Sequence, residues 1–233
     1  MIKALKQFLQ SLRFKWNRYK YREFAHPTKF DWRWGKKPFN RIAVVNRLII
    51  EAGGWNTKYL EIGCNKNSLF HSVIAKQKVG VDPVRGGNKR MTSDQFFSQN
   101  PTGLFDVIFV DGLHEYQQVR RDVINALEHI PVGGLIGLHD LLPGTWESQH
   151  IPRITSKWNG DTWKISLELV KATGIEFAIV AVDEGVGVIR KVSNDVEIPD
   201  LNLAPNKYKT FVDHQSSLPI IEFEQLNSFL GHS

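Results

Sequence analysis

The 233-residue sequence lacks the features that define several specialised protein classes. Its one cysteine, Cys64, cannot form a disulfide framework, so nothing indicates secretion. No apolar run approaches the roughly 18 residues of a membrane-spanning helix, and the N-terminus lacks the apolar block of a signal peptide. The dinucleotide-binding pattern G-x-G-x-x-G is missing, which argues against a dehydrogenase. We therefore expect a cytoplasmic protein with one domain and a small appendage.

Acidic residues are scarce near the N-terminus. Residues 1–41 contain twelve Lys and Arg but only Glu23 and Asp31, which gives this arm a net charge of about +10. The whole chain carries +6, so the remainder carries about −4. The basic character thus belongs to the arm and not to the fold. No nucleic-acid-binding motif accompanies the arm, so no nucleic-acid partner is expected.

Apolar residues recur every three or four positions in residues 2–22 and predict an amphipathic helix. The stripe consists of Ile2, Leu5, Leu9, Leu12, Trp16 and Tyr19, and it is flanked by Lys3, Lys6, Arg13 and Lys20. Two interpretations stay open. The favoured one is a helix that docks on its own domain or on a partner subunit of a homo-oligomer. The other is a helix that lies on the inner, anionic surface of a membrane, with its aromatic side chains at the interface.

Strand and helix patterns alternate after the arm and predict an α/β domain. The predicted strands are 58–62, 78–82, 105–111, 135–140, 176–182 and 186–190, and the predicted helices are 39–52, 68–76, one beginning near Ser93, 116–130, 162–173 and a short one near 222–230. The last two strands are joined by a turn and predict a hairpin. We divide the chain into an arm and linker (1–38), a central domain (39–193) and a C-terminal extension (194–233) whose role the sequence does not indicate.

Polar residues follow four of the predicted strands at the point where each strand ends. They are Glu61 with Gly63, Asp82, Asp111, and His139 with Asp140. In an open parallel sheet the carboxyl ends of the strands meet at one edge, and ligands bind just outside that edge. The sequence therefore predicts a site built from these residues.

The loop after strand 58–62 has the properties of a nucleoside site. Gly63 is its one glycine, and Asn65 and Asn67 stand where further glycines are expected. Asn is the non-glycine residue that best tolerates left-handed backbone, so a tight turn remains feasible.

Asp82 lies twenty-one residues after Glu61, which is the usual spacing of an acid that binds ribose hydroxyls. We favour this role. The structural alternative is that Asp82 caps the turn at Pro83.

Two further strand ends carry groups suited to deprotonation and metal binding. Asp111 and His114 are three residues apart and could share one substrate hydroxyl or one metal ion. Asp111, Asp140 and His139 together offer hard oxygen ligands and one imidazole, a set compatible with Mg²⁺. The structural alternatives are that His114 or Glu115 caps the following helix and that Asp140 pairs with a basic residue.

The segment 158–163 follows these strand ends and contains two tryptophans and an acid. Trp158, Asp161 and Trp163 suit stacking on a sugar ring and hydrogen bonding to its hydroxyls. Equally, Asp161 could cap the following helix while the tryptophans pack it against the domain.

These motifs resemble those of class I S-adenosylmethionine-dependent methyltransferases. The similar runs are Tyr59-Leu-Glu-Ile-Gly63, Gly80-Val-Asp82, Asp111-Gly-Leu-His114 and Gly133-Gly-Leu-Ile-Gly-Leu-His-Asp140. The nearest likeness is to metal-dependent O-methyltransferases of sugars, macrolides and catechols, over about residues 40–192. The resemblance implies a Rossmann-like, doubly wound α/β fold, with a mostly parallel seven-stranded sheet and a C-terminal antiparallel β-hairpin.

The resemblance also implies roles for individual residues. The cofactor S-adenosylmethionine would contact Glu61, Gly63, Asn65, Asp82, Ser93, Asp94 and Asp111, and a divalent ion such as Mg²⁺ would bind Asp111, His139 and Asp140. His139 stands where the family commonly has a second acid. His114, beside Asp111, matches a position that can serve as general base.

We therefore expect O-methylation of a hydroxyl on a sugar, a glycan or a glycosylated small molecule. A catechol-type acceptor and a non-catalytic cofactor-binding or scaffold protein are the alternatives. A nucleic-acid methyltransferase is disfavoured, because such N-methylating enzymes usually carry an Asn/Asp-Pro-Pro-aromatic run where this chain has Asp111-Gly-Leu-His114.

Overall fold

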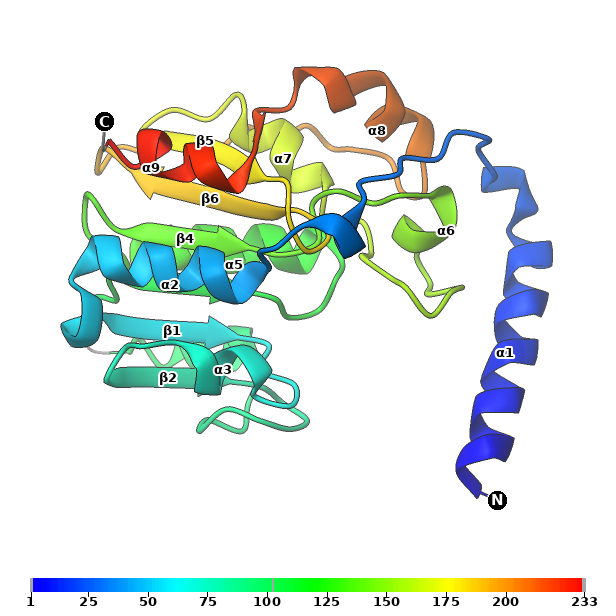
Figure 1. Cartoon of the computed structure of the whole chain (residues 1–233), viewed down its shortest axis with the longest axis horizontal. Helices are drawn as coiled ribbons and strands as arrows, with labels where there is room; N and C mark the ends of the chain where they lie inside the picture. Colours follow the sequence, from blue (N-terminus) through cyan, green and yellow to red (C-terminus); the bar gives the residue numbers. More distant parts are fainter. Residues whose placement is uncertain (1, 102, 232–233) are drawn as a thin grey trace.

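A seven-stranded sheet in the order β2-β1-β3-β4-β6-β5-β7 forms the centre of the fold (Figure 1). The computed structural model describes residues 2–101 and 103–231, with the backbone alone for residues 2–4 and 6. The strands are β1 (Lys58–Ile62), β2 (Gln77–Val81), β3 (Val107–Val110), β4 (Leu135–Leu138), β5 (Ile175–Val180), β6 (Val186–Lys191) and β7 (Ile220–Ile221). Strands β1 to β4 are parallel, and β6 runs antiparallel to both β4 and β5. The predicted fold class is confirmed, including the β5–β6 hairpin.

Helices cover both faces of the sheet because successive strand residues point to opposite sides. Val107 and Phe109 of β3 belong to one hydrophobic core, and Ile108 and Val110 belong to the other. The first core is covered by α2 (Arg41–Ala52), α3 (Ser68–Ser72) and α9 (Leu226–Phe229), and the second by α4 (Ser93–Ser98), α5 (Tyr116–Glu128), α6 (Trp146–Gln149), α7 (Lys164–Leu169) and α8 (Tyr208–His214). This is the doubly wound arrangement that the alternating pattern predicts.

Several helix ends differ from the predicted bounds, whereas α4 begins at Ser93 as predicted. Helix α3 ends at Ser72 instead of Lys76, because Val73 adopts an extended conformation and its β-branched side chain is buried. Helix α4 is capped by Thr92, whose side chain accepts a hydrogen bond from Gln95 N while the Gln95 side chain accepts one from Thr92 N.

The C-terminal segment 194–233 completes the domain. Its strand β7 pairs in parallel with β5, and its side chains Tyr208, Phe211, Leu226 and Leu230 are buried in the two cores. The seventh strand of the sheet therefore comes from the segment whose role the sequence did not indicate.

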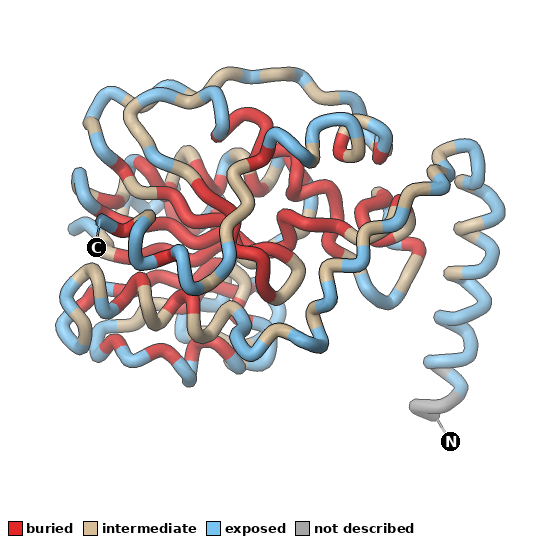
Figure 2. The backbone as a smooth tube through the Cα atoms, turned by 45° about the horizontal axis from the view of Figure 1, so that its top comes forward, coloured by how far each residue is buried: buried red, intermediate tan, exposed pale blue. Residues whose placement is uncertain are grey.

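Helix α1 (Ile2–Lys20) stands away from the rest of the fold, as Figures 1 and 2 show. Its apolar stripe is exposed, with 45–65 % of the surface of Leu5, Leu9, Leu12, Trp16 and Tyr19 accessible. Docking of this helix on its own domain, which was one part of the favoured interpretation, is therefore wrong. Within the described residues, no helix is long and apolar enough to cross a membrane.

Candidate active site

The parallel register aligns the ends of four strands. Ile62 pairs with Val81 and Val110, and Val110 pairs with Leu138, so the residues that follow these positions emerge at one edge. Backbone hydrogen bonds continue the alignment past the strands, from Asp111 N to Ile62 O (2.8 Å) and from His139 N to Val110 O (3.1 Å). The predicted strand-end residues thus lie at one edge of the sheet.

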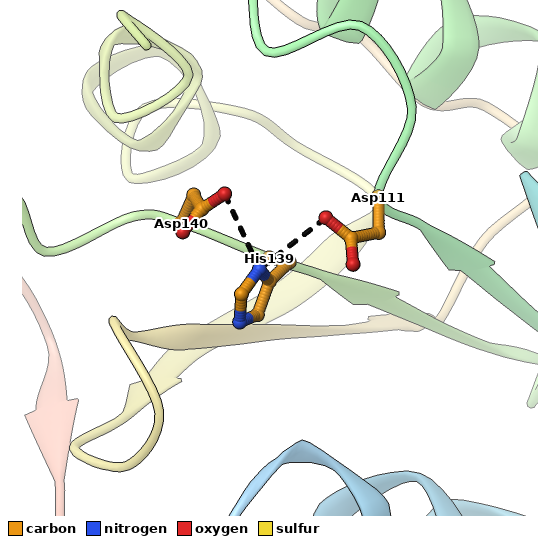
Figure 3. A group of neighbouring side chains, drawn as sticks. All are labelled: Asp111, His139 and Asp140. Carbon is orange, nitrogen blue, oxygen red and sulfur yellow. Dashed lines mark ion pairs between the residues drawn. The ribbon is translucent and has the colours of Figure 1, made fainter. Parts of the chain in front are cut away.

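Asp111, His139 and Asp140 form a compact cluster at this edge (Figure 3). His139 Nδ1 lies 3.3 Å from Asp111 Oδ1 and 3.3 Å from Asp140 Oδ2. One ligand atom from each of the three residues lies within 4.8 Å of the others, so the three could hold a metal ion. Two carboxylates and one imidazole form a donor set that suits Mg²⁺ or a similar divalent ion.

The hydrogen bonding of His139 supports this fit. Its Nε2 lies 2.8 Å from the carbonyl oxygen of Asp183, so Nε2 is the donor and Nδ1 faces the two carboxylates. Metal-binding histidines typically donate their second nitrogen to a carbonyl in this way. Burial opposes a charge on His139, but Asp140 and Asp111 outweigh it and hold the pKa of the imidazole well above its ordinary value. A cation between the carboxylates is thus strongly favoured, whether a proton or a metal ion.

Arg41, at the start of α2, supplies positive charge to the same cluster. Its Nη1 donates to Asp111 Oδ2 (2.8 Å) and lies 3.0 and 3.1 Å from the two ring nitrogens of His139. Its Nε lies 3.1 Å from Asp183 Oδ2. A metal ion bound to Asp111 would therefore share that carboxylate with the guanidinium or displace it.

Arg41, Asp183 and Glu184 were not predicted from the sequence as site residues. Arg41 precedes a helix, and no strand-end pattern points to it. Asp183 and Glu184 were interpreted only as a hairpin turn, but β5 runs antiparallel to β6 and so parallel to β4, and its carboxyl end lies at the edge where β4 ends. Following strand direction through the predicted hairpin would have identified this fifth strand end.

His114 lies beside the cluster and contacts both carboxylates. Its Nδ1 is 2.7 Å from Asp140 Oδ2 and its Nε2 is 3.5 Å from Asp111 Oδ1. Its ring stacks on Trp158, with centroids 5.4 Å apart and planes 4° from parallel. Burial lowers the pKa of His114, but Asp140 and Asp111 outweigh burial and raise it above its ordinary value. The arrangement orients the imidazole and stabilises its protonated form. Neither His114 nor Glu115 caps α5 with its side chain.

The segment 158–163 packs against the His114 loop in a way that changes two predicted roles. Gly160 (φ +65°) approaches so closely that a Cβ there would lie 1.6 Å from His114 O. The side chain of Asp161 accepts from Tyr116 N (2.7 Å), which caps α5, and pairs with Lys164 Nζ (2.6 Å). It is 6 % exposed and caps α5, whereas α7, the helix that follows Asp161 in the sequence, has no side-chain cap.

Trp163 and Trp158 have opposite environments. Trp163 is fully buried, and its ring packs edge-on against Phe211 while its Nε1 donates to Gln149 Oε1. A sugar cannot reach it, so the predicted stacking role of Trp163 is wrong. Trp158 is half-buried beside His114 and remains a candidate substrate contact. The neighbouring Asn159 was missed, although its amide donates to Asp140 Oδ1 (2.8 Å).

The loop after β1 has the left-handed backbone that its sequence predicts. Gly63, Asn65 and Asn67 have φ values of +87°, +48° and +64°. A Cβ on Gly63 would lie 2.0 Å from the carbonyl oxygen of Asp111, so only glycine fits between the ends of β1 and β3. The two asparagines therefore take the place of the expected glycines without opening the turn.

Asp82 at the end of β2 is surrounded by backbone amides. Its Oδ1 accepts from Val84 N and Arg85 N, both at 2.8 Å, and its Oδ2 accepts from Asn65 N at 2.8 Å. Although burial opposes ionisation, these bonds outweigh it and lower the pKa of the carboxyl. Asp82 thus caps the turn at Pro83, which was the alternative to ribose binding. Its hydrogen bond from Asn65 N also connects the β2 loop to the β1 loop.

Comparison with known proteins identifies the domain. Residues 61–141 match a family described as a methyltransferase domain. The O-methyltransferase of Bacillus cereus, solved with S-adenosylhomocysteine, is 12 % identical over 82 % of this chain and 100 % of its own, with a TM-score of 0.50. TomG of Streptomyces achromogenes, solved with S-adenosylmethionine, is 12 % identical over 66 % of this chain and 80 % of its own, also with a TM-score of 0.50. Both share its fold.

A third similar structure is MycE from the mycinamycin biosynthetic pathway, solved with Mg and S-adenosylhomocysteine. It is 19 % identical over 66 % of this chain and 50 % of its own, with a TM-score of 0.44, so the chain spans about half the length of MycE. A search of curated proteins finds no match.

The family match and the sheet order point to the same fold. Residues 61–141 match a methyltransferase domain, and the sheet that contains them has the fold of the two solved O-methyltransferases. The matched residues 61–141 contain every strand-end residue that was selected from the sequence. Helix α1, the segment 22–40 and the C-terminal segment lie outside the match.

The remaining cofactor candidates of the methyltransferase domain lie on either side of the β1 loop. Glu61 is buried and accepts a hydrogen bond from Tyr59 OH (2.7 Å), and burial raises its pKa to about 7. Ser93 and Asp94 accept from Gln118 Nε2, at 3.2 and 3.0 Å. The same amide reaches Asp122, a further buried carboxyl whose pKa burial raises to about 6. Asp122 was missed, since it lies within a helix stripe and not at a strand end.

The strand ends of the methyltransferase domain are closely packed. The cavity lined by Asp111, His114, His139 and Asp140 has a volume of about 10 Å³, whereas ligand sites typically have roughly 300–1,000 Å³. A larger hollow of about 720 Å³ lies at the opposite edge, where Lys58 and Gln77 begin their strands, and no candidate residue lines it.

Proposed function

We propose that this chain transfers the methyl group of S-adenosylmethionine to a hydroxyl oxygen, with His114 as general base. The observation that carries the proposal is the pairing of His114 Nδ1 with Asp140 Oδ2 at 2.7 Å. Because Asp140 Oδ2 lies beside Nδ1, Nε2 is left to take a proton from a substrate, and the carboxylate stabilises the imidazolium that results. The raised pKa of His114 has the same cause and favours proton acceptance.

The reaction that fits this geometry is an in-line displacement. As the acceptor oxygen bonds to the methyl carbon, the carbon–sulfur bond breaks, and the hydroxyl proton passes to His114. Asp111, His139 and Asp140 would hold a divalent ion such as Mg²⁺, which lowers the pKa of a bound hydroxyl. Arg41 and Asn159 bond to Asp111 and Asp140, and so hold these carboxylates in position.

We favour a sugar hydroxyl as acceptor, and a catechol is the alternative. The test follows label from S-adenosylmethionine into methyl glycosides and into catechol, in the presence of MgCl₂. His114→Ala should lower transfer by about 10²–10⁴-fold and leave S-adenosylhomocysteine binding, measured by calorimetry, unchanged. His71→Ala, which changes an exposed histidine on α3, is the matched control.

Three outcomes would contradict parts of the proposal. Full activity of the His114 variant would remove its role as base. Methylation of catechol alone would replace the sugar by the alternative acceptor. A chain that does not bind S-adenosylhomocysteine would favour a scaffold without catalytic activity.

Helix α1 supports a second, independent part of the proposal, which is contact with an anionic membrane surface. The exposed apolar stripe is accompanied by Arg13, Lys15, Arg18, Lys20 and Arg22, and residues 1–22 contain no acid. This combination is typical of interfacial helices. Two copies of α1 would repel each other, so we favour lipid over self-association, although the domain itself could still form a homo-oligomer.

Vesicle flotation tests this placement at the inner membrane surface. The full chain should float with vesicles that contain phosphatidylglycerol and not with pure phosphatidylcholine, and deletion of residues 1–24 should abolish flotation. Leu12→Glu should weaken flotation more than Gln10→Glu, because both add one negative charge but only Leu12 belongs to the apolar stripe. Equal flotation of the deleted chain would exclude the membrane role, and a dimer lost on deletion would favour a partner subunit.

A further inference from the structure

A cleft of about 630 Å³ opens beside the candidate active site and is not used by the reaction described so far. It lies between two segments that are far apart in the sequence. Its lining consists of residues 30–35 on one side and Gly144, Thr145, Ser148, Thr155, Ser156, Lys157, Asn159 and Glu184 on the other. The volume is within the range of small-molecule sites. Residues 30–35 precede the matched segment 61–141, and the other lining residues follow it. None of the lining residues lies within the match.

One wall of the cleft is a row of three aromatic rings. Phe30 stacks on Trp32 with centroids 5.3 Å apart, and Trp32 stacks on Trp34 at 5.9 Å, each pair 21° from parallel. The row is fixed to the domain, because Phe30 N donates to Gly144 O (2.9 Å) and Trp32 Nε1 donates to Pro143 O (3.4 Å). Trp34 ends the row, lines the cleft and is half-buried.

The opposite wall is polar and leads to the reacting groups. Asn159 Nδ2 donates both to Asp140 Oδ1 (2.8 Å) and to Glu184 Oε2 (3.3 Å). Asp140 in turn pairs with His114. The polar wall of the cleft is therefore linked to His114 through Asn159 and Asp140.

The lining distinguishes a sugar from a flat aromatic acceptor. An aromatic ring with two hydroxyls is best enclosed by an apolar slot that offers one or two polar contacts. This cleft offers one aromatic wall and, across from it, hydroxyl, amide, ammonium and carboxylate groups from Thr155, Ser156, Lys157, Asn159 and Glu184. A pyranose has an apolar face of C–H groups that packs on an indole ring and hydroxyls around its edge that need such partners.

We propose that this cleft is the acceptor site and that it binds a sugar ring, with Trp34 as the stacking surface and Asn159 and Glu184 as hydroxyl partners. The proposal rests on the methyltransferase function proposed above and names its substrate class and site. It transfers the stacking role from Trp163, which is buried, to a tryptophan in the segment that precedes the domain.

Saturation-transfer NMR on the full chain, with excess S-adenosylhomocysteine, tests the site. The ligands are the methyl glycosides of glucose, galactose, mannose and rhamnose, with catechol for comparison. We expect at least one glycoside to bind, and Trp34→Ala to weaken that binding by about tenfold. Trp34→Phe should retain part of it. Trp55→Ala is the matched control, since Trp55 is 63 % exposed and lies next to the start of β1, at the opposite edge of the sheet.

The outcomes separate this proposal from the one on which it rests. A chain that binds S-adenosylhomocysteine but no glycoside, or a Trp34→Ala variant that binds glycosides as well as the unmodified chain does, would overturn the cleft as sugar site. Catechol binding that depends on Trp34, without glycoside binding, would overturn the sugar class. A chain that binds glycosides but not S-adenosylhomocysteine would overturn the methyltransferase function and leave the cleft as a sugar site.

Discussion

The two halves of the strand-end edge are stabilised in different ways. At the ends of β1 and β2, backbone amides surround Asp82 and left-handed residues shape the loop. At the ends of β3, β4 and β5, the side chains of Asp111, His139 and Asp183 are held by each other and by Arg41. Backbone hydrogen bonds fix a shape, whereas paired side-chain charges can exchange one cation for another. The first half is thus suited to hold a cofactor and the second to carry chemistry.

Gly63 joins the two halves, so its substitution should have the largest effect. Gly63→Ala must accommodate a Cβ 2.0 Å from Asp111 O, at a φ of +87°. We expect a loss of about 3–5 kcal/mol in the free energy of unfolding, measured by urea denaturation. Gly103→Ala is the matched control, because Gly103 has a φ of +86° but no atom within 4 Å of its added Cβ. It should lose only about 1–2 kcal/mol. Equal losses would mean that the contact between the halves is unimportant.

Glu61 lies at the end of β1, in the half of the edge that backbone hydrogen bonds stabilise. Its ionisation should make the stability of the fold depend on pH. Burial raises its pKa to about 7 from an ordinary value of 4.5. The folded state therefore holds a proton that the unfolded state releases, and the stabilisation present below pH 4.5 is lost as the pH rises through 7.

Glu61→Gln cannot ionise and should be more stable than the unmodified chain at pH 8, by about 2 kcal/mol, with little difference at pH 4. Thermal unfolding at both pH values measures this difference. The control variant Glu224→Gln, at an exposed position, should have the same stability as the unmodified chain at both pH values. A stability gain of Glu61→Gln that is the same at pH 4 and pH 8 would contradict the assignment to ionisation.

Substitution of Arg41 should have the smallest effect of the three. It tests whether the Arg41 guanidinium and a metal ion compete for Asp111 at the ends of β3, β4 and β5. Because its guanidinium bonds to Asp111, Arg41→Gln should increase the affinity for Mn²⁺ about tenfold, as measured by calorimetry with MnCl₂. Arg47→Gln on the same helix, where Arg47 pairs with Glu51, should not change it. A lower affinity of the Arg41 variant would show that Arg41 positions the metal ligands and does not compete with the ion.

Some residues at the strand-end edge could be predicted from the sequence and others could not. Glu61, Asp82, Asp111, His139 and Asp140 were found because strand ends follow from local apolar runs, and a parallel sheet places them at one edge. Arg41, Asp183, Asn159 and Asp122 were missed. Their contacts depend on how α2, the β5–β6 turn, the 158–163 segment and α5 pack, and no local pattern records that packing.

The sequence alone determined the alternation of strands and helices, the left-handed β1 loop and the polar strand ends, because each depends on a few neighbouring residues. Only the tertiary structure decided which tryptophan can meet a ligand. Trp158, Trp163, Trp32 and Trp34 each have a charged residue within two positions, yet Trp163 is buried and Trp34 lines a cleft. The exposure of an aromatic ring is fixed by distant segments such as α8, which covers Trp163 through Phe211. The same holds for α1. The sequence predicts its helix and its apolar stripe, but only the tertiary structure shows that the stripe is exposed.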